Sequence, residues 1–182
     1  MPLLMLKDLP RYECLLKAAE QYPEMSLSAN EAFLNLLWTA DLVFAEKGRF
    51  LNQIGLSQGR FTVLMLLSHC GENPATPASL ADEAGVTRAT MTGIVDTLER
   101  DGLVIREPDP SDRRTLRVRL TEAGQAFVEK MIPGWFQQVA AMIHPLSEEE
   151  RKTLVGLLQK IQAGLTPALP EPSSSEPASS EA

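Results

Sequence analysis

The strongest structural pattern in this 182-residue chain lies in residues Thr76 to Thr121, TPASLADEAGVTRATMTGIVDTLERDGLVIREPDPSDRRTLRVRLT. Its first half predicts two short helices joined by a tight turn. Ala81 is small enough for the helices to approach closely, and Gly85 can adopt the positive φ that the turn needs. Thr87 can cap the second helix, which the spacing of apolar residues predicts to end at Arg100. These features indicate a helix-turn-helix.

The second half of this segment predicts a hairpin with strands at 103–107 and 116–120. In the second strand apolar residues alternate with arginines, so one face is expected to be apolar and the other basic. The loop at 108–115 is long, and long loops on short hairpins usually serve a function. A helix-turn-helix followed by a basic hairpin is typical of a winged helix, which reads the major groove with one helix and adds a flanking wing contact.

Residues Leu80 to Gly124, LADEAGVTRATMTGIVDTLERDGLVIREPDPSDRRTLRVRLTEAG, resemble the MarR (multiple antibiotic resistance regulator) family of transcription factors. The Asp-x-Arg wing followed by a strand and Leu-Thr is fairly specific, whereas many families share the helix-turn-helix spacing. The resemblance implies a homodimer formed by the terminal helices. Such a dimer should bind a pseudo-palindromic operator with half-sites roughly 34 Å apart.

The expected DNA contacts come from the second helix and from the wing. On the helix, Arg88 can pair with guanine edges and threonine methyl groups can contact thymine, although Arg88 can also be a surface or phosphate-binding arginine. The resemblance assigns Arg114 to the minor groove, whereas the simpler interpretation is an ordinary loop charge. Asp112 should orient an arginine, because a carboxylate would repel phosphate. The predicted DNA-binding residues are Thr87, Arg88, Thr90, Thr92, Gly93, Arg113 and Arg114.

The overall composition gives no basic signature. The formal net charge is −7, and the segment 76–121 contains seven arginines and eight acidic residues. We therefore expect modest non-specific DNA affinity that salt removes readily. The two histidines, His69 and His144, have no metal-ligand neighbours at suitable spacing, and the glycines form no phosphate-binding loop. The sequence predicts a protein without catalytic, metal or cofactor sites.

Cys14 and Cys70 suit a reducing cytoplasm without disulfides, and buried thiols are the ordinary interpretation. A redox sensor is the alternative. Hydroperoxide sensors of the MarR family carry a cysteine near the start of the first core helix, where residues 33–44 here have none.

No apolar run is long enough to cross a membrane, and the first ten residues are too short for a signal peptide. We expect a cytoplasmic location.

The chain divides into five expected segments. These are an N-terminal extension with a short helix (1–27), a first dimerisation helix and loop (28–56), the winged helix-turn-helix (57–120), C-terminal dimerisation helices (121–165) and a disordered tail (166–182). The first long helix is predicted at Ser28–Lys47, starting at a capping box formed by Ser28 and Glu31. Its apolar residues surround most of its circumference, so it needs both its own core and a second subunit as partners. Pro133 should kink the helix that follows the wing.

The family resemblance also implies an effector site. Its members often bind small aromatic or phenolic ligands between the dimerisation helices and the DNA-binding lobe. Trp38, Asp41 and Leu42 share one face of the first long helix, and an indole beside a carboxylate suits such a pocket. The alternative is that Trp38 belongs to the dimer core.

Together these patterns predict a mainly α fold, in which a winged helix-turn-helix with a two-stranded β wing is flanked by N- and C-terminal dimerisation helices. The predicted function is a ligand-responsive homodimeric repressor that binds double-stranded operator DNA. Two alternatives are a redox-sensing regulator and a winged helix used only for protein association. The association module would need no wing arginines and usually has an attached catalytic domain.

Overall fold

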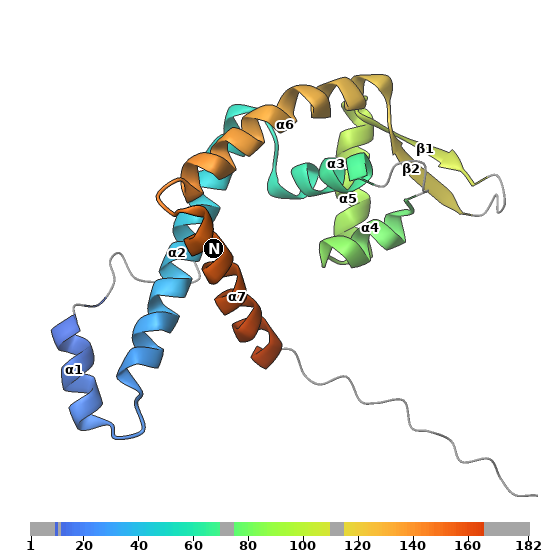
Figure 1. Ribbon diagram of the computed structural model, residues 1–182. Coiled ribbons are helices and arrows are strands. Elements are labelled where there is room, and N and C mark those ends of the chain that lie inside the picture. Colours follow the sequence, from blue (N-terminus) through green and yellow to red (C-terminus); the bar gives the residue numbers. More distant parts are fainter. Residues whose placement is uncertain (1–9, 11, 70–74, 110–114, 166–182) are drawn as a thin grey trace, which may run out of the picture. The chain divides into compact units, whose positions relative to one another are not determined.

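The computed structural model describes residue 10 and residues 12–69, 75–109 and 115–165. The described residues form a mainly helical fold with one two-stranded sheet, as predicted (Figure 1). The elements in chain order are α1 (Tyr12–Gln21), α2 (Leu27–Gln53), α3 (Gln58–His69), α4 (Pro77–Ala84), α5 (Arg88–Arg100), β1 (Val104–Pro108), β2 (Leu116–Leu120), α6 (Glu122–Ile143) and α7 (Glu148–Leu165).

The chain forms two compact units, Met1–Ala140 and Ala141–Ala182. The first contains α1 to β2 and most of α6, and the second contains the end of α6 and α7. The five expected segments stay a prediction, and the tail from residue 166 lies outside the described residues.

The core of the first unit lies in the winged helix. Met91, Val95 and Leu98 on α5 are fully buried, as the apolar stripe predicted, whereas Ile94 on the same stripe is only half-buried. The α5 stripe packs with apolar side chains from α3, α4, both strands and α6. The fully buried partners are Val63, Leu64, Leu80, Ala81, Val104, Val118 and Val128. This packing fixes α5 in the body of the lobe, with its other face exposed.

Local sequence signals set the helix-turn-helix. Thr76 and Ser79 form a reciprocal capping box at the start of α4, and Thr87 caps α5 through the amide of Thr90 at 3.2 Å. Gly85 lies between the helices at φ 63°, a left-handed conformation that glycine adopts without strain. The Thr87 cap and the left-handed turn at Gly85 were predicted from the sequence, whereas the capping box of Thr76 and Ser79 is seen only in the structure.

β1 and β2 form the antiparallel stem of the wing, with Arg106 opposite Val118 in the register. The amide of Val118 also donates to the carbonyl of Ala75 at 2.7 Å, which ties the hairpin to the segment before α4. The predicted apolar face is only partly confirmed, because Val118 is buried while Leu116 is exposed. Residues 110–114 at the tip lie outside the described residues.

The backbone just before β1 lies very close to the start of α6. A Cβ atom placed on Gly124 would lie 1.9 Å from the carbonyl oxygen of Leu103. Any side chain at this position would therefore move the junction between α5 and β1. The sequence analysis did not identify this requirement.

The predicted start and end of α2 are wrong. Ser26, rather than Ser28, caps the helix, and its Oγ accepts a hydrogen bond from the amide of Ala29 at 3.4 Å. The helix also continues past Lys47 to Gln53, because Phe50 and Leu51 are buried in the core and packing favours the extra turns.

Further features can be compared with the described residues. Ser147 and Glu150 form a reciprocal cap at the start of α7, and α6 continues through Pro133, where a kink was expected. Cys14 is exposed, so the expectation of a buried thiol is wrong there, and Cys70 lies outside the described part of the chain. Within the described residues, no helix could span a membrane and no cluster of metal-binding side chains occurs.

Candidate nucleic-acid interface

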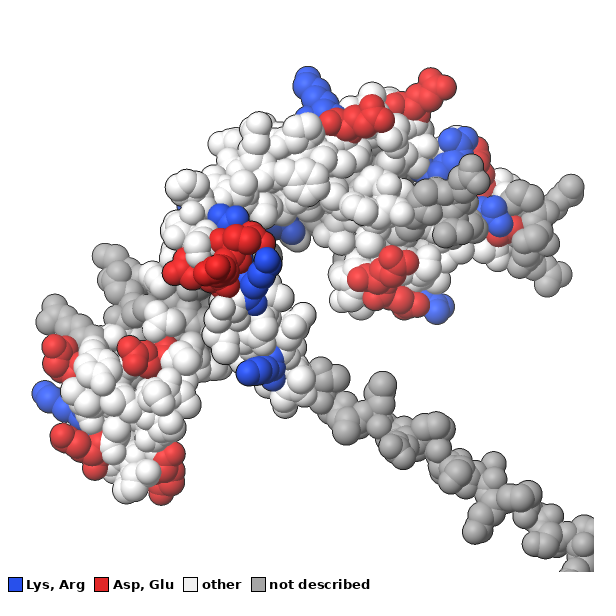
Figure 2. Space-filling model, viewed as in Figure 1, with Lys and Arg blue, Asp and Glu red and all other residues white. Residues whose placement is uncertain are grey.

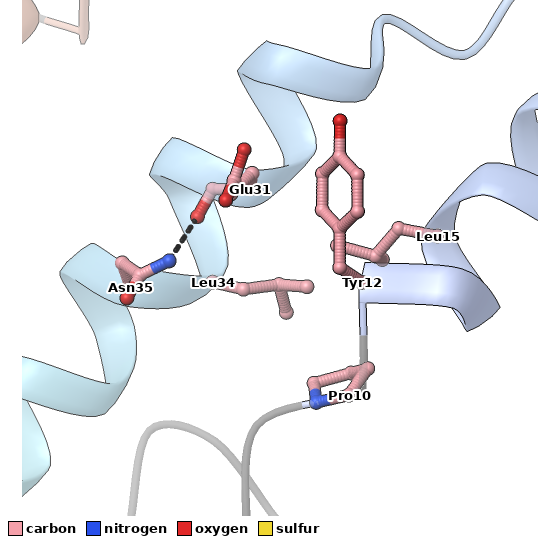
Figure 3. Close-up of a pocket in the computed structure, with 6 residues that line it drawn as sticks. All are labelled: Pro10, Tyr12, Leu15, Glu31, Leu34 and Asn35. Atoms are coloured by element: carbon pink, nitrogen blue, oxygen red, sulfur yellow. Dashed lines mark hydrogen bonds between the residues drawn. The ribbon is translucent and has the colours of Figure 1, made fainter.

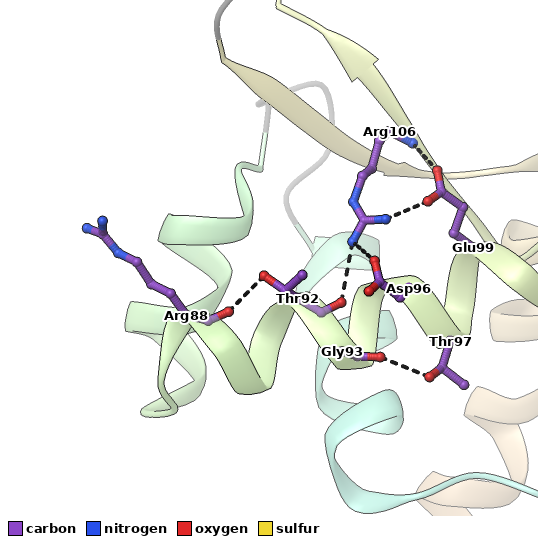
Figure 4. A network of polar contacts seen from close by, with 7 residues as sticks. All are labelled: Arg88, Thr92, Gly93, Asp96, Thr97, Glu99 and Arg106. Carbon is purple, nitrogen blue, oxygen red and sulfur yellow. Dashed lines mark hydrogen bonds and ion pairs between the residues drawn. The ribbon is translucent and has the colours of Figure 1, made fainter.

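The predicted contact surface on α5 is exposed. Thr87, Arg88, Thr90, Thr92 and Gly93 all lie on the outer face of the helix or its cap. The Arg88 side chain extends away from the body of the lobe in Figure 4 and forms no ion pair with any described acid. The Thr92 hydroxyl donates to the Arg88 carbonyl at 2.9 Å, so its hydrogen is already used and its methyl group remains for apolar contact. This face offers one unpaired cation and small side chains.

Packing against the described residues does not require a glycine at position 93. A Cβ atom at this position would meet nothing within 4 Å. Glycine inside a helix costs about 1 kcal/mol relative to alanine, so the fold alone would favour alanine here. A glycine on this exposed face instead permits close approach by another molecule.

The two arginines on β2 are both paired with acids, so the expectation of a basic strand face is wrong. Arg117 Nε donates to Asp109 Oδ2 at 2.6 Å. Arg119 forms a fork on Glu107, with distances of 2.8 Å from Nε and 2.5 Å from Nη2. The hydrogen bond from Arg119 lowers the pKa of the Glu107 carboxyl group. In Figure 2, blue and red atoms are accordingly interspersed on the face shown.

Arg106 on β1 connects the wing stem to α5. Its Nη1 donates to Glu99 Oε2 at 2.5 Å and its Nη2 to Asp96 Oδ1 at 2.6 Å, with a longer contact of 3.4 Å to the Thr92 carbonyl (Figure 4). The backbone amide of Arg106 also donates to Glu99 Oε1 at 3.1 Å. Burial opposes the charge of Arg106, but the two carboxylates together raise its pKa. The sequence pattern did not identify this network, because its acids lie on α5 and its arginine on β1.

The three wing-tip residues in the prediction, Asp112, Arg113 and Arg114, lie outside the described residues. The stem that carries them is closed by a hydrogen bond of 2.8 Å from the Asp109 amide to the Thr115 carbonyl. Their contacts with DNA therefore stay a prediction.

A second polar feature lies where α2, α3 and α6 meet. Lys47 Nζ lies 4.9 Å from the ring centroid of Phe61 and 5.4 Å from that of Trp135. Trp135 also packs on Phe61 and Phe50, with centroids 5.0 and 5.8 Å away. Burial lowers the pKa of Lys47, and no described carboxylate forms an ion pair with it. The sequence analysis missed this aromatic–lysine cluster because its members come from three distant segments.

The predicted effector residues lie elsewhere on α2. Trp38 and Asp41 are half-buried, and Leu42 is 52% exposed. At 100° per residue, Lys47 falls opposite Trp38 on the helix. The structure therefore does not place Trp38 in the aromatic–lysine cluster, and the role of Trp38 stays a prediction.

Helix α1 of the N-terminal extension packs on α2. A pocket of about 240 Å³ lies between α1 and α2, and Figure 3 shows its lining. The lining residues are Pro10, Tyr12, Leu15, Glu31, Leu34 and Asn35. Trp38 shares the α2 face of Glu31, Leu34 and Asn35, one to two turns further on.

Comparison with known proteins agrees with this architecture. The MarR family model matches residues 56–116. The HTH-type transcriptional repressor YetL of Bacillus subtilis is 35% identical over 153 residues, which cover 84% of this chain and 92% of YetL.

Two solved structures extend the comparison. Sco3205 of Streptomyces coelicolor, a MarR family transcriptional regulator in complex with DNA, is 25% identical with a TM-score of 0.70, and the match covers 79% of this chain and 91% of Sco3205. Bordetella bronchiseptica BpsR, whose DNA binding is regulated by 6-hydroxynicotinic acid, is 27% identical with a TM-score of 0.60, covering 70% and 89% of the two chains. The chain therefore belongs to the MarR family of winged helix-turn-helix transcriptional regulators, which are not enzymes.

Proposed function

We propose that this regulator is a homodimeric repressor that inserts α5 into the major groove of a pseudo-palindromic operator and places its wing in the adjacent minor groove. The observation that carries the proposal is the exposed face of α5, where Arg88 has no ion-pair partner among the described residues and stands on a helix that the core holds in place. Arginine pairs well with guanine edges, and the small neighbours of Arg88 leave room for the bases. The repressor YetL and the DNA complex of Sco3205 support the same use of the fold.

The apolar surfaces of the terminal helices support the homodimer. Helices α1 and α7 contain no buried residue, yet α7 carries five large apolar side chains that are exposed. They are Leu154, Val155, Leu157, Ile161 and Leu165. Contiguous apolar patches on a soluble chain usually mark an interface. A second copy would cover such surfaces and hold two α5 helices at operator spacing.

A fluorescence anisotropy titration with the intergenic DNA upstream of the gene tests the proposal. Specific binding that weakens steeply with salt is expected, together with a dimer in light scattering. Arg88→Ala should reduce the affinity by about 1–3 kcal/mol. Arg100→Ala, an exposed arginine at the far end of α5, is the matched control. If the folded protein did not bind this DNA, the result would instead favour the alternative of a protein-association module.

The effector is proposed to be a small aromatic acid. The aromatic–lysine cluster has a half-buried ammonium group over aromatic rings that forms no ion pair with a described carboxylate, and this suits a carboxylate or phenolate on an aromatic ring. The regulation of BpsR by 6-hydroxynicotinic acid supports this ligand class. The alternative site is the one predicted around Trp38, Asp41 and Leu42.

Two single-tryptophan variants distinguish these sites. Trp135→Phe leaves Trp38 as the reporter, and Trp38→Phe leaves Trp135. An aromatic acid that releases DNA should change the emission of the tryptophan that it contacts over the same concentration range. A change confined to Trp135 would assign the effector to the aromatic–lysine cluster, and a change confined to Trp38 would assign it to the predicted site. Release of DNA without either change would exclude both.

A further inference from the structure

We propose that Arg106 is a positioning residue, which holds the wing at a fixed orientation to α5 so that both can contact DNA at once. The inference rests on the proposed operator binding. It assigns to Arg106 a role in affinity that does not require Arg106 to contact DNA.

The geometry of Arg106 suits orientation better than simple attachment. Its guanidinium group bridges Asp96 and Glu99 at 2.6 and 2.5 Å, and its backbone amide adds a third link to Glu99. A planar guanidinium group that binds two carboxylates at fixed angles restrains rotation as well as distance. Arg106 is therefore the point at which the direction of the hairpin is coupled to α5.

The coupled residues lie within the proposed DNA-binding part of α5. Thr92, Asp96 and Glu99 follow one another at helical spacing, and Thr92 is itself a proposed contact residue. The Arg106 side chain is 18% exposed, whereas those of Asp96 and Glu99 are 50% and 38% exposed. The Arg106 side chain is thus held in place by its neighbours and lies mostly below the surface that is proposed to contact DNA.

The hairpin needs such a link because it consists of only two strands. Two-stranded hairpins are marginally stable alone. Buried Val104 and Val118 anchor the base of the wing, but apolar contacts are not directional. The hydrogen bond from the Val118 amide ties β2 to the segment before α4, and the Arg106 fork supplies the directional contact between β1 and α5. Simultaneous contact in two grooves gains affinity only when the geometry permits both contacts, so a freely rotating wing would lose that gain.

Arg106 also offsets part of the negative charge of two carboxylates that would otherwise repel phosphate. A useful experiment must separate this charge effect from positioning. The triple variant R106Q/D96N/E99Q does so, because it removes the charged links and changes the formal charge of the network from −1 to 0. If only charge mattered, this variant should bind DNA at least as well as the wild type.

The experiment compares full-length dimers of wild type, R106Q, R106K and the triple variant in operator titrations. If Arg106 positions the wing, R106Q and the triple variant should each lose affinity on the order of tenfold, as expected for removing hydrogen bonds between charged groups. R106K keeps the charge and one possible contact, so it should recover part of the loss. R119Q, which breaks the exposed pair with Glu107 within the wing, is the matched control and should lose less.

Amide hydrogen exchange without DNA provides the second measurement. The amides of β1 and β2 should exchange faster in R106Q and in the triple variant, whereas buried amides of α3 should be unchanged. Wild-type affinity in the triple variant would overturn the proposal, as would unchanged exchange in the wing. If the wild type itself did not bind the operator, the proposed function would fail, while the exchange data would still show whether Arg106 orders the wing.

Discussion

The winged helix and the terminal helices differ in how completely they bury their apolar residues. In the winged helix, α3, α4 and α5 bury their apolar stripes against one another and against the strands. Helices α1 and α7, although amphipathic, bury none of their residues completely. The winged helix therefore has a complete core of its own, whereas the terminal helices need a further partner. This difference supports the proposal that DNA contact and assembly use different parts of the chain.

The largest predicted effect comes from placing a charge on a terminal helix. Leu157 on α7 is 53% exposed, so Leu157→Arg should leave the fold intact while preventing association. Loss of the second half-site should weaken operator binding by about 10²- to 10⁴-fold, because linked sites gain this much from avidity.

Light scattering and operator titration measure the two consequences together. Gln159→Arg, at an exposed polar position of the same helix, is the control for the added charge. A Leu157→Arg protein that remains dimeric and binds DNA normally would show that this part of α7 is not the interface.

A substitution in the core of the winged helix should reduce the stability of the fold, in contrast to the substitution on α7. Leu98 on α5 is fully buried, so Leu98→Ala should reduce the free energy of unfolding of the winged helix by about 2–5 kcal/mol. Leu157→Ala removes the same atoms from an exposed site and should cost less, with the remaining cost dependent on protein concentration. Thermal unfolding at two concentrations measures both. Equal, concentration-independent losses would contradict the distinction between the two regions.

The wing tip is the next test. Arg114→Ala should weaken operator binding by about 1–3 kcal/mol, provided that the side chain enters the minor groove. Because an arginine in an exposed loop supports no core, circular dichroism and thermal unfolding should match the wild type. Operator affinity in the folded variant is the measurement, and an unchanged value would remove Arg114 from the interface.

The sequence predicted best those features that depend on neighbouring residues. The cap at Thr87 and the left-handed Gly85 each follow from local backbone chemistry. Ser26 and Ser28 are both plausible caps by type, so the start of α2 was assigned to the wrong one. The end of the same helix depended on burial of Phe50 and Leu51, which a local pattern does not reveal.

The ionic contacts of the site required the three-dimensional structure. Arg106 and Asp96 are ten residues apart and belong to different elements, so no helical or strand periodicity joins them. The same applies to Lys47 and Trp135, which meet only because α2 and α6 pack near α3. The sequence could identify which face of α5 is exposed, but not which arginines of the wing are already paired.

Gly93 gives the smallest expected effect and the most direct test of the α5 surface. A Cβ atom here meets nothing within 4 Å in the protein, so Gly93→Ala should stabilise the fold by up to about 1 kcal/mol. The same methyl group would project from the face that is proposed to approach the bases, so operator affinity should fall while stability rises.

Gly48→Ala in α2 also has open space around its Cβ and is the matched control, expected to gain similar stability with unchanged affinity. Thermal unfolding and operator titration of both variants give the answer. Opposite changes in stability and affinity at Gly93 alone would place DNA against this turn of α5, because no described residue lies close enough to require a glycine there. A Gly93→Ala protein that gains stability and keeps full affinity would show that DNA does not approach α5 closely at this residue, and the interface would have to be centred nearer to Arg88.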